Sequence, residues 1–439
     1  MNKKRTFHEK EKKILLSPLP TVQDICREVR VRLNMSTDVS DERVYTCIDE
    51  VIMEASRGRH MGLEYKVNLR ETAFNSLRRL DVLQNLLEDD EITEIMINSY
   101  DNIFVEKKGK IMQTDLCFES ISRYEDIVQQ IVSGANRMVN QTTPIVDVRL
   151  KDGSRVNVIL APVAIDGTTM TIRKFLDKGW NMNKLVQKGA LSEGMAEFFR
   201  ILVCSRYNII VSGSTGSGKT TLLNLLSEFI PDTERIVTIE DSAELNLRNI
   251  PNMVRLETKN ANVEGEHEIK IGELIKASLR MRPDRIIVGE VRGEEAFFMI
   301  NAAMNTGHDG SLSTCHANSC QDALGRLETM VLMGCEMPLP AIRRQIGSAI
   351  DIVIQLGRLR DKSRKVLEIC EVAGMEGDEI LLNPLFVFKE EGEGDGWIKG
   401  NWEFQNPIRR RTKLFQAGYE KAMCQIEESE RIRQEGHRC

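Results

Sequence analysis

The stretch "SGSTGSGKTT" (Ser212–Thr221) decides the fold of this chain. Its residues from Gly213 to Thr220 match the pattern G-x-x-x-x-G-K-[ST] without a mismatch. The apolar "NIIVS" before it is typical of a buried strand, and "TTLLNLLSEF" after it is typical of a helix. A glycine-rich loop between a strand and a helix predicts a phosphate cradle made of backbone N–H groups and the positive end of the helix.

We expect this loop to bind ATP together with Mg²⁺. Lys219 would reach the β- and γ-phosphates, and the hydroxyl of Thr220 would ligate the metal. The residues predicted to bind the nucleotide are Gly213, Ser214, Thr215, Gly216, Ser217, Gly218, Lys219, Thr220 and Thr221.

The length of 439 residues is enough for two or three domains. A hydrophobic fraction of 41% and a charged fraction of 29% are typical of a globular protein, and no run of ~18 apolar residues would span a bilayer. The basic start, "MNKKRTFHEKEKK", has no apolar segment behind it, so we expect no secretory signal. Ten scattered cysteines without a Cys-x-x-Cys pair predict free thiols in a reducing compartment. We therefore expect a cytoplasmic protein.

Residues 1–74 are charged and have the periodicity of amphipathic helices, which predicts a helical N-terminal extension. Thr21–Leu33, Asp41–Ala55 and a third segment, Phe74–Asp90, would pack as a small bundle. The first segment places four apolar side chains on one stripe, namely Val22, Ile25, Val29 and Leu33.

Residues 75–176 change to the period-two pattern of strands. Glu91–Ile111 alternates in this way, and three further short β-branched runs follow a predicted helix at Tyr124–Val139. This part predicts a smaller α+β domain. Residues 177–194 predict a linker with a short helix.

From residue 195 to 439, strands such as "YNIIVSG", "ERIVTIED" and "DRIIVGEV" alternate with helical segments. Such alternation predicts an α/β fold with a largely parallel sheet that helices cover on both faces. The acidic, glycine-rich Lys389–Asn401 predicts a hairpin tip, and the residues beyond Glu420 predict a charged helix.

Hydrolysis also needs an acidic residue that holds the metal or activates water at the end of a buried strand. "RIIVGEVRG" supplies Glu290, which we predict to be the catalytic acid and, with Thr220, a ligand of Mg²⁺, partly through water. "RIVTIEDSAEL" supplies a second acidic strand end at Glu240. One acidic strand end is usually a solvated loop, but two of them downstream of this loop favour the catalytic interpretation.

The segment "TGHDGSLSTCHANS" holds two of the six histidines, His308 and His316, among small polar residues. Zinc bound by Cys315, His316 and Cys320 is one alternative, but this spacing lacks a fourth ligand. A solvated loop is another. We favour a histidine that contacts phosphate or metal-bound water, because the glycines of the segment allow close approach of the backbone.

Together these motifs resemble the ATPases of the type II/type IV secretion superfamily, and most closely the CpaF-type (TadA-like) branch that powers assembly of tight-adherence (Flp) pili. The resemblance rests on "GSTGSGKTT", "IEDSAEL", "RPDRIIVGEVRG" and "TGHDGSLSTCHANS" and covers roughly residues 75–420. It implies a RecA-like P-loop domain preceded by a smaller, PAS-like α+β domain. It also implies nucleotide between the two lobes and a hexameric ring of protomers.

The resemblance implies roles for single residues. Glu290 would be the essential acid of the Walker B strand, and Glu240 the acidic-box residue near the attacking water. His308 or His316 would be the histidine-box contact to the nucleotide.

Arginines of the N-terminal lobe would close over the phosphates, with Arg173 as the first candidate and Arg155 and Arg149 behind it. Another set would reach the site of a neighbouring protomer, namely Arg280, Arg282 or Arg292.

The implied function is an ATP-hydrolysing hexameric motor at the cytoplasmic face of the inner membrane, which pushes on a membrane platform protein to extrude pilin subunits. The ATPase of a type IV secretion or conjugation channel is the first alternative. A RecA-type nucleic-acid motor is the second, but a net charge of −6 and an aromatic fraction of 5% do not favour a basic pore lined by aromatics. We therefore expect no direct contact with nucleic acid. Two acidic boxes also argue against a nucleotide-binding scaffold without turnover.

Overall fold

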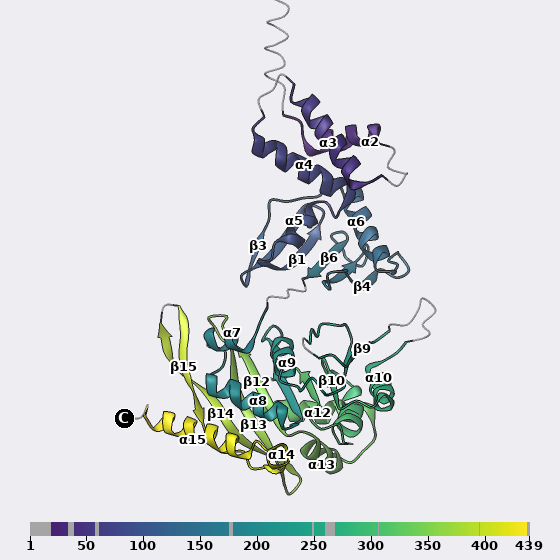
Figure 1. The fold of residues 1–439 in the computed structure, drawn as a ribbon. Helices are drawn as coiled ribbons and strands as arrows, with labels where there is room; N and C mark the ends of the chain where they lie inside the picture. Colours follow the sequence, from purple (N-terminus) through teal and green to yellow (C-terminus); the bar gives the residue numbers. More distant parts are fainter. Residues whose placement is uncertain are drawn as a thin grey trace, which may run out of the picture. The chain divides into compact units, whose positions relative to one another are not determined.

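The computed structural model describes residues 19–33, 39–57, 61–174, 179–247, 250–259, 268–305, 307–394 and 396–436. The chain forms two compact units, residues 1–176 and 177–439, and Figure 1 colours them along the sequence. The basic start of the chain and the first residues of the expected linker lie outside the described residues. No helix in the described ranges is both long and apolar enough to cross a membrane.

The N-terminal unit begins with three helices that pack together: α2 (Val22–Arg32), α3 (Asp41–Ala55) and α4 (Leu63–Arg78). Thr21 caps the first of them, because its side chain accepts from the backbone N–H of Asp24. The predicted stripe faces the core of this bundle: three of its side chains are buried and the fourth packs against them, namely Ile25, Val29, Leu33 and Val22.

The prediction of a single helix at Phe74–Asp90 is wrong. The chain forms α4, which begins at Leu63, and a separate short helix α5 (Val82–Glu88). Asp81 between them has a φ of 54°, which no continuous α-helix accommodates. The expected boundary between residues 74 and 75 therefore falls inside α4.

The rest of this unit is a six-stranded antiparallel sheet in the order β3-β2-β1-β6-β5-β4. Helix α6 (Ile121–Gly134) buries Ile127, Val128 and Val132 in the same core as the strands. This is the predicted α+β arrangement. The strands are β1 (Ile92–Ser99), β2 (Asn102–Lys107), β3 (Lys110–Gln113), β4 (Ile145–Arg149), β5 (Arg155–Ile159) and β6 (Thr169–Arg173).

The second unit is built on a nine-stranded sheet in the order β15-β14-β13-β12-β7-β11-β10-β8-β9. The six strands from β12 to β9 in this order are parallel, and three antiparallel strands extend the sheet beyond β12 (Figure 1). The strands are β7 (Ile209–Gly213), β8 (Ile236–Glu240), β9 (Met253–Glu257), β10 (Arg285–Val288), β11 (Leu312–Cys315), β12 (Ile352–Arg358), β13 (Arg364–Glu376), β14 (Glu379–Gly394) and β15 (Trp397–Phe404).

Helices cover both faces of this sheet, and the predicted α/β architecture is confirmed. Alternate residues of β7 enter different cores: Ile209 and Val211 on one face, Ile210 on the other. The first face is covered by α8 (Glu193–Cys204), α9 (Lys219–Ser227), α14 (Thr412–Ala417) and α15 (Glu420–Gly436), with α7 (Met182–Gln187) packed against α8. The second is covered by α10 (Ile271–Ser278), η1 (Leu279–Met281), α11 (Glu295–Phe298), η2 (Met299–Met304), α12 (Cys320–Gly334) and α13 (Leu339–Ala349).

Strand β10 begins at a buried ion pair that anchors the amino end of the strand leading to Glu290. Nε and Nη2 of the fully buried Arg285 lie 2.6 and 3.0 Å from the two carboxylate oxygens of Glu234. Nη1 of Arg285 also donates to the carbonyl of Val203 at 2.8 Å. A Cβ on Gly310 would lie 2.6 Å from this guanidinium, so a glycine of the histidine segment makes room for Arg285.

We expect Glu234→Gln to lower the free energy of unfolding by about 3 kcal/mol or more, because it leaves a buried guanidinium without its counter-charge. The control is Arg206→Gln, since Nη2 of Arg206 also contacts Glu234, at 3.3 Å, but its side chain is 41% exposed. That variant should lose less than ~1 kcal/mol. Urea unfolding of the full chain measures both, and equal midpoints for the two variants would contradict the importance of the buried pair.

Candidate functional site

The loop between β7 and α9 has the backbone form that a phosphate cradle requires. Gly216 and Gly218 have φ values of 73° and 100°, in the left-handed region that favours glycine. A Cβ on Gly213 would lie 2.6 Å from the carbonyl oxygen of Leu356, so a larger residue would not fit there. The nine predicted nucleotide-binding residues run from Gly213, the last residue of β7, through this loop into the first turn of α9. The loop therefore points its backbone N–H groups and a helix N-terminus at one place.

The side chain of Lys219 is held over this loop. Its Nζ donates to the carbonyl oxygens of Gly213 at 3.1 Å and Ser214 at 3.2 Å. The same nitrogen lies 3.2 Å from Nδ1 of His316. Lys219 is only 8% exposed, so its positive charge acts in a largely dehydrated place.

His316 and Glu290 meet beside Lys219. The strands β7, β11, β10 and β8 are parallel, so their carboxyl ends lie at one edge of the sheet. His316 follows β11 and Glu290 follows β10, and Nε2 of His316 lies 2.7 Å from Oε1 of Glu290. The other carboxylate oxygen, Oε2, accepts from Nη2 of Arg292 at 2.6 Å.

The charge state of His316 follows from its neighbours. Burial and the positive charge of Lys219 lower its pKa, against the opposing pull of Glu290. A neutral imidazole at neutral pH retains one acceptor nitrogen. His316 can therefore accept a hydrogen from Lys219 or from a water molecule.

Glu240 ends β8 at the same edge and is 3% exposed. Its Oε1 accepts from the backbone N–H groups of Glu244 at 2.8 Å and Leu245 at 2.7 Å, and Oε2 has no hydrogen-bond partner among the described residues. A Cβ on Gly289 would lie 3.0 Å from its Cγ, which explains glycine before Glu290. Burial raises the pKa of Glu240 to about 7, against the two backbone hydrogen bonds. Glu240 can therefore carry or release a proton near neutral pH.

We expect the contribution of Glu240 to stability to fall as the pH rises from about 4.5 to about 7, because folding raises its pKa over that interval. The unfolded chain releases this proton first, so the contribution is complete at low pH and lost above the folded pKa, in total about 3 kcal/mol. Glu240→Gln, which cannot titrate, should be more stable than the wild type at pH 8, and this gain should shrink towards pH 5. Thermal unfolding in a metal chelator measures it, with the exposed Glu376→Gln as control. A gain independent of pH would contradict the assignment to Glu240.

The structure does not bring His308 to this edge. His308 precedes β11, so it lies at the amino end of that strand, where its Nδ1 contacts the carbonyl oxygen of Pro283 at 3.0 Å. Arg280 and Arg282 precede β10 and lie at the same opposite edge, both exposed. Of the three arginines proposed to act on a neighbour, Arg292 alone contacts the site of its own chain.

The arginines of the N-terminal unit form a row. The antiparallel registers pair Arg149 with Arg155 and Arg155 with Arg173. Beyond Arg173 the next position is Glu94 of β1. The registers therefore place three positive side chains next to one another on neighbouring strands, an arrangement that suits an anion.

Two contacts at the site were not predicted from the sequence. The hydroxyl of Thr314 donates to the carbonyl oxygen of Gly289 at 2.8 Å and so fixes the residue before Glu290. Arg364 begins β13, and a Cβ on Gly218 would lie 3.7 Å from its Cδ, so this arginine passes beside the phosphate loop. The period-two pattern in "STCHA" could have indicated a strand that brings Thr314 to the site. The segment "DKSRKV" offers no such signal for Arg364.

Comparison with known proteins gives concordant matches. The family described as "Type II/IV secretion system protein" matches residues 77–393. The conjugal transfer protein TrbB of Rhizobium radiobacter is 32% identical over 298 residues, which are 67% of this chain and 88% of that protein. The type IV secretion system protein PtlH homolog of Bordetella bronchiseptica is 32% identical over 316 residues, 66% of this chain and 93% of that protein.

Among solved structures, the pilus retraction motor PilT with bound ADP is similar in fold. It is 19% identical, with a TM-score of 0.50 over 80% of this chain and 89% of that chain. At this identity the similarity supports the fold alone, and it includes the N-terminal domain as well as the P-loop domain.

Proposed function

This chain belongs to the type II/IV secretion system protein family and is an ATPase of that family, and on this premise we propose that it is a homo-hexameric motor for assembly of a tight-adherence (Flp) pilus. The observation that carries the ATP-hydrolysing part of the proposal is the convergence of Lys219, His316 and Glu290 at the carboxyl edge of the parallel sheet, while the pilus and the hexamer rest on the resemblance of the sequence motifs. A cation for the phosphates and a residue that positions the attacking water are groups that phosphoryl transfer to water uses.

Mg²⁺ bound with ATP would be held by Thr220 and by Glu290, partly through water. Both side chains offer oxygen, which Mg²⁺ prefers, and both lie at the same edge of the sheet. The metal supplies positive charge that neutralises the phosphates. Lys219 would orient the β- and γ-phosphates, while Glu290 and Glu240 would take part in positioning the attacking water and holding its proton.

We further propose that Arg173, with Arg155 and Arg149 beside it, supplies positive charge to the γ-phosphate. The position of the three arginines on neighbouring strands supports the proposal, because a row of positive charge suits an anion as highly charged as the γ-phosphate. An arginine in such a role is worth about 10³-fold or more in rate.

Arg280, Arg282 and His308 are proposed to act on the site of a neighbouring protomer. They lie at the amino edge of the sheet, opposite the phosphate loop of their own chain. A head-to-tail interface that closes into a ring would bring this edge of one protomer to the loop of the next.

The names of the relatives favour a second candidate, the ATPase of a type IV secretion or conjugation channel, since TrbB is a conjugal transfer protein and PtlH a type IV secretion system protein. Both candidates place the motor at the inner membrane with a platform protein as its partner. Pull-down of small pilins and their platform protein would favour the pilus, and channel components would favour the alternative.

The proposed ring is tested by measuring whether ATP turnover depends on contact between protomers. ATPase rate per protomer should rise with protein concentration until the ring is populated. An Arg280→Ala protomer mixed with a Lys219→Ala protomer should recover activity that neither has alone, because each mixed interface pairs an intact loop with an intact arginine. A rate per protomer that stays constant down to concentrations where only monomer is present would overturn the ring mechanism.

A further inference from the structure

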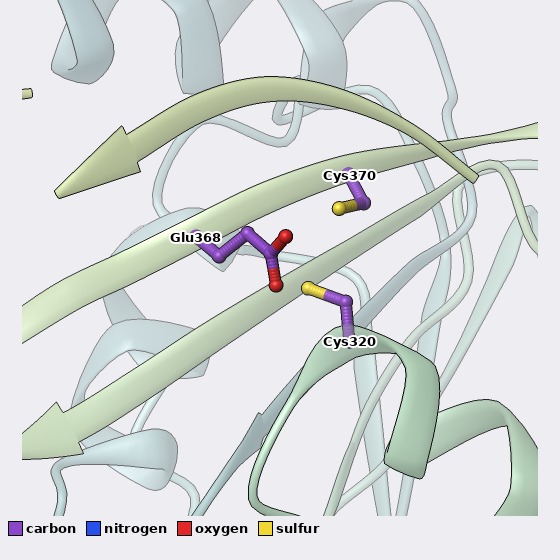
Figure 2. A group of neighbouring side chains, drawn as sticks. All are labelled: Cys320, Glu368 and Cys370. Carbon is purple, nitrogen blue, oxygen red and sulfur yellow. The ribbon is translucent and has the colours of Figure 1, made fainter. Parts of the chain in front are cut away.

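Three side chains with metal-binding atoms meet where α12 packs against β13, outside the phosphate site. They are Cys320, Glu368 and Cys370, and their ligand atoms all lie within 4.8 Å of one another. Figure 2 shows the three side chains pointing toward one another, one from the first residue of the helix and two from the strand. Glu368 and Cys370 share a face of β13 because they are two residues apart.

The surroundings of this cluster favour a cation. Cys320 and Cys370 are buried in the apolar core on that face, at 0% and 1% exposure. The half-buried carboxylate of Glu368 has no basic partner in the part of the chain that the structure describes. A carboxylate held against an apolar core without a counter-charge is costly. A divalent ion would supply that charge.

The donor set also selects the ion. Two thiolates and one carboxylate are ligands that Zn²⁺ accepts, and Zn–S and Zn–O bonds of ~2.3 and ~2.1 Å put tetrahedral ligand atoms somewhat under 4 Å apart. The observed separations therefore need only a small contraction. The hydrogen bond with Cys370, together with burial, holds the pKa of the Cys320 thiol above its usual range, so binding would release the thiol protons.

We propose that Cys320, Cys370 and Glu368 form a zinc site with a water molecule as fourth ligand. This site shares Cys320 with the zinc alternative considered from the sequence but differs from it in its other ligands, because Cys315 and His316 are not part of the cluster. The ion would fix the start of α12, four residues after His316, to the strand that carries Arg364 past the phosphate loop. It would thus stiffen the two segments that flank the nucleotide.

The test is zinc binding to the reduced, untagged full-length protein. Millimolar Mg²⁺ is present to compete with Zn²⁺ at the phosphate site, so that zinc bound there is not counted. Zn²⁺ is supplied from a buffer of competing chelator, and bound metal is counted by elemental analysis. We expect one tightly held Zn²⁺ per chain, a higher Tm with zinc, and an intense thiolate-to-metal absorption band when Co²⁺ replaces it.

Cys320→Ala and Cys370→Ala should each lose the tight site and the zinc-dependent rise in Tm. Cys335→Ala, a half-buried thiol at the other end of α12, should keep both. If either alanine variant fails to fold, Glu368→Gln, of nearly the same shape, should still weaken zinc at least tenfold, with Glu376→Gln on the same strand as control. Zinc binding unchanged in these variants, or a Cys320–Cys370 disulfide in place of metal in the native protein, overturns the proposal.

Discussion

Replacing Lys219 with alanine is expected to reduce ATP turnover by at least ~10²- to 10³-fold and to weaken nucleotide binding. The change removes the cation that contacts the loop carbonyls of Gly213 and Ser214 and the ring of His316. Because Lys219 is 8% exposed, its charge is little screened by water and its loss should have a large effect. Steady-state phosphate release and binding of a fluorescent ATP analogue measure the two effects.

The matched control is Lys421→Ala, which removes an exposed lysine from α15 in the same unit. It should leave both turnover and binding unchanged. Circular dichroism and Tm show whether the Lys219 variant is folded. Turnover near the wild-type value in a folded Lys219→Ala protein would mean that this loop does not carry the reaction.

The phosphate loop was predictable because its chemistry and its geometry are local. Glycines at Gly216 and Gly218 are required by the left-handed backbone, and their spacing from Lys219 is part of the same short pattern. The contact between Glu290 and His316 joins residues that are far apart in the sequence. It follows from a parallel sheet, whose carboxyl ends share one edge, and the alternation of strands and helices predicted that sheet.

The choice between His308 and His316 was open from the sequence because both lie in one segment of small polar residues. It depends on where β11 begins and ends, since His308 precedes the strand and His316 follows it. Strand ends are the least predictable feature of a sequence. The separation of the two histidines to opposite edges therefore required the structure.

The zinc cluster was not predictable, because two of its residues lie on β13, a strand without a clear sequence signal. The segment from Arg364 to Glu376 mixes charged, apolar and glycine residues, and its pairing with β14 contains bulges. Such irregular antiparallel additions do not follow from the alternation that predicted the parallel strands. The break at Asp81 was missed for a related reason, since its left-handed backbone comes at a residue other than glycine.

Glu290→Gln is expected to separate ATP binding from hydrolysis. Turnover should fall by about 10²- to 10⁴-fold, the usual contribution of a group that accepts or directs a proton. The amide keeps the shape of the carboxylate, and its oxygen can still accept from Nη2 of Arg292. The charge that organises metal and water is lost, while the phosphate contacts of the loop remain. ATP should therefore stay bound without being cleaved.

A control four residues further on is Glu294→Gln, which removes an exposed carboxylate paired with Lys270 at 3.1 Å and should leave turnover unchanged. The decisive measurement is nucleotide retained on the protein after rapid gel filtration: the Glu290 variant should carry ATP, and the wild type ADP. Loss of ATP binding in a folded Glu290→Gln protein would make Glu290 a structural residue that holds His316 and Arg292 in place. Wild-type turnover, with ADP on the variant as on the wild type, would instead move the catalytic acid to Glu240, whose buried carboxyl ends the neighbouring strand at the same edge.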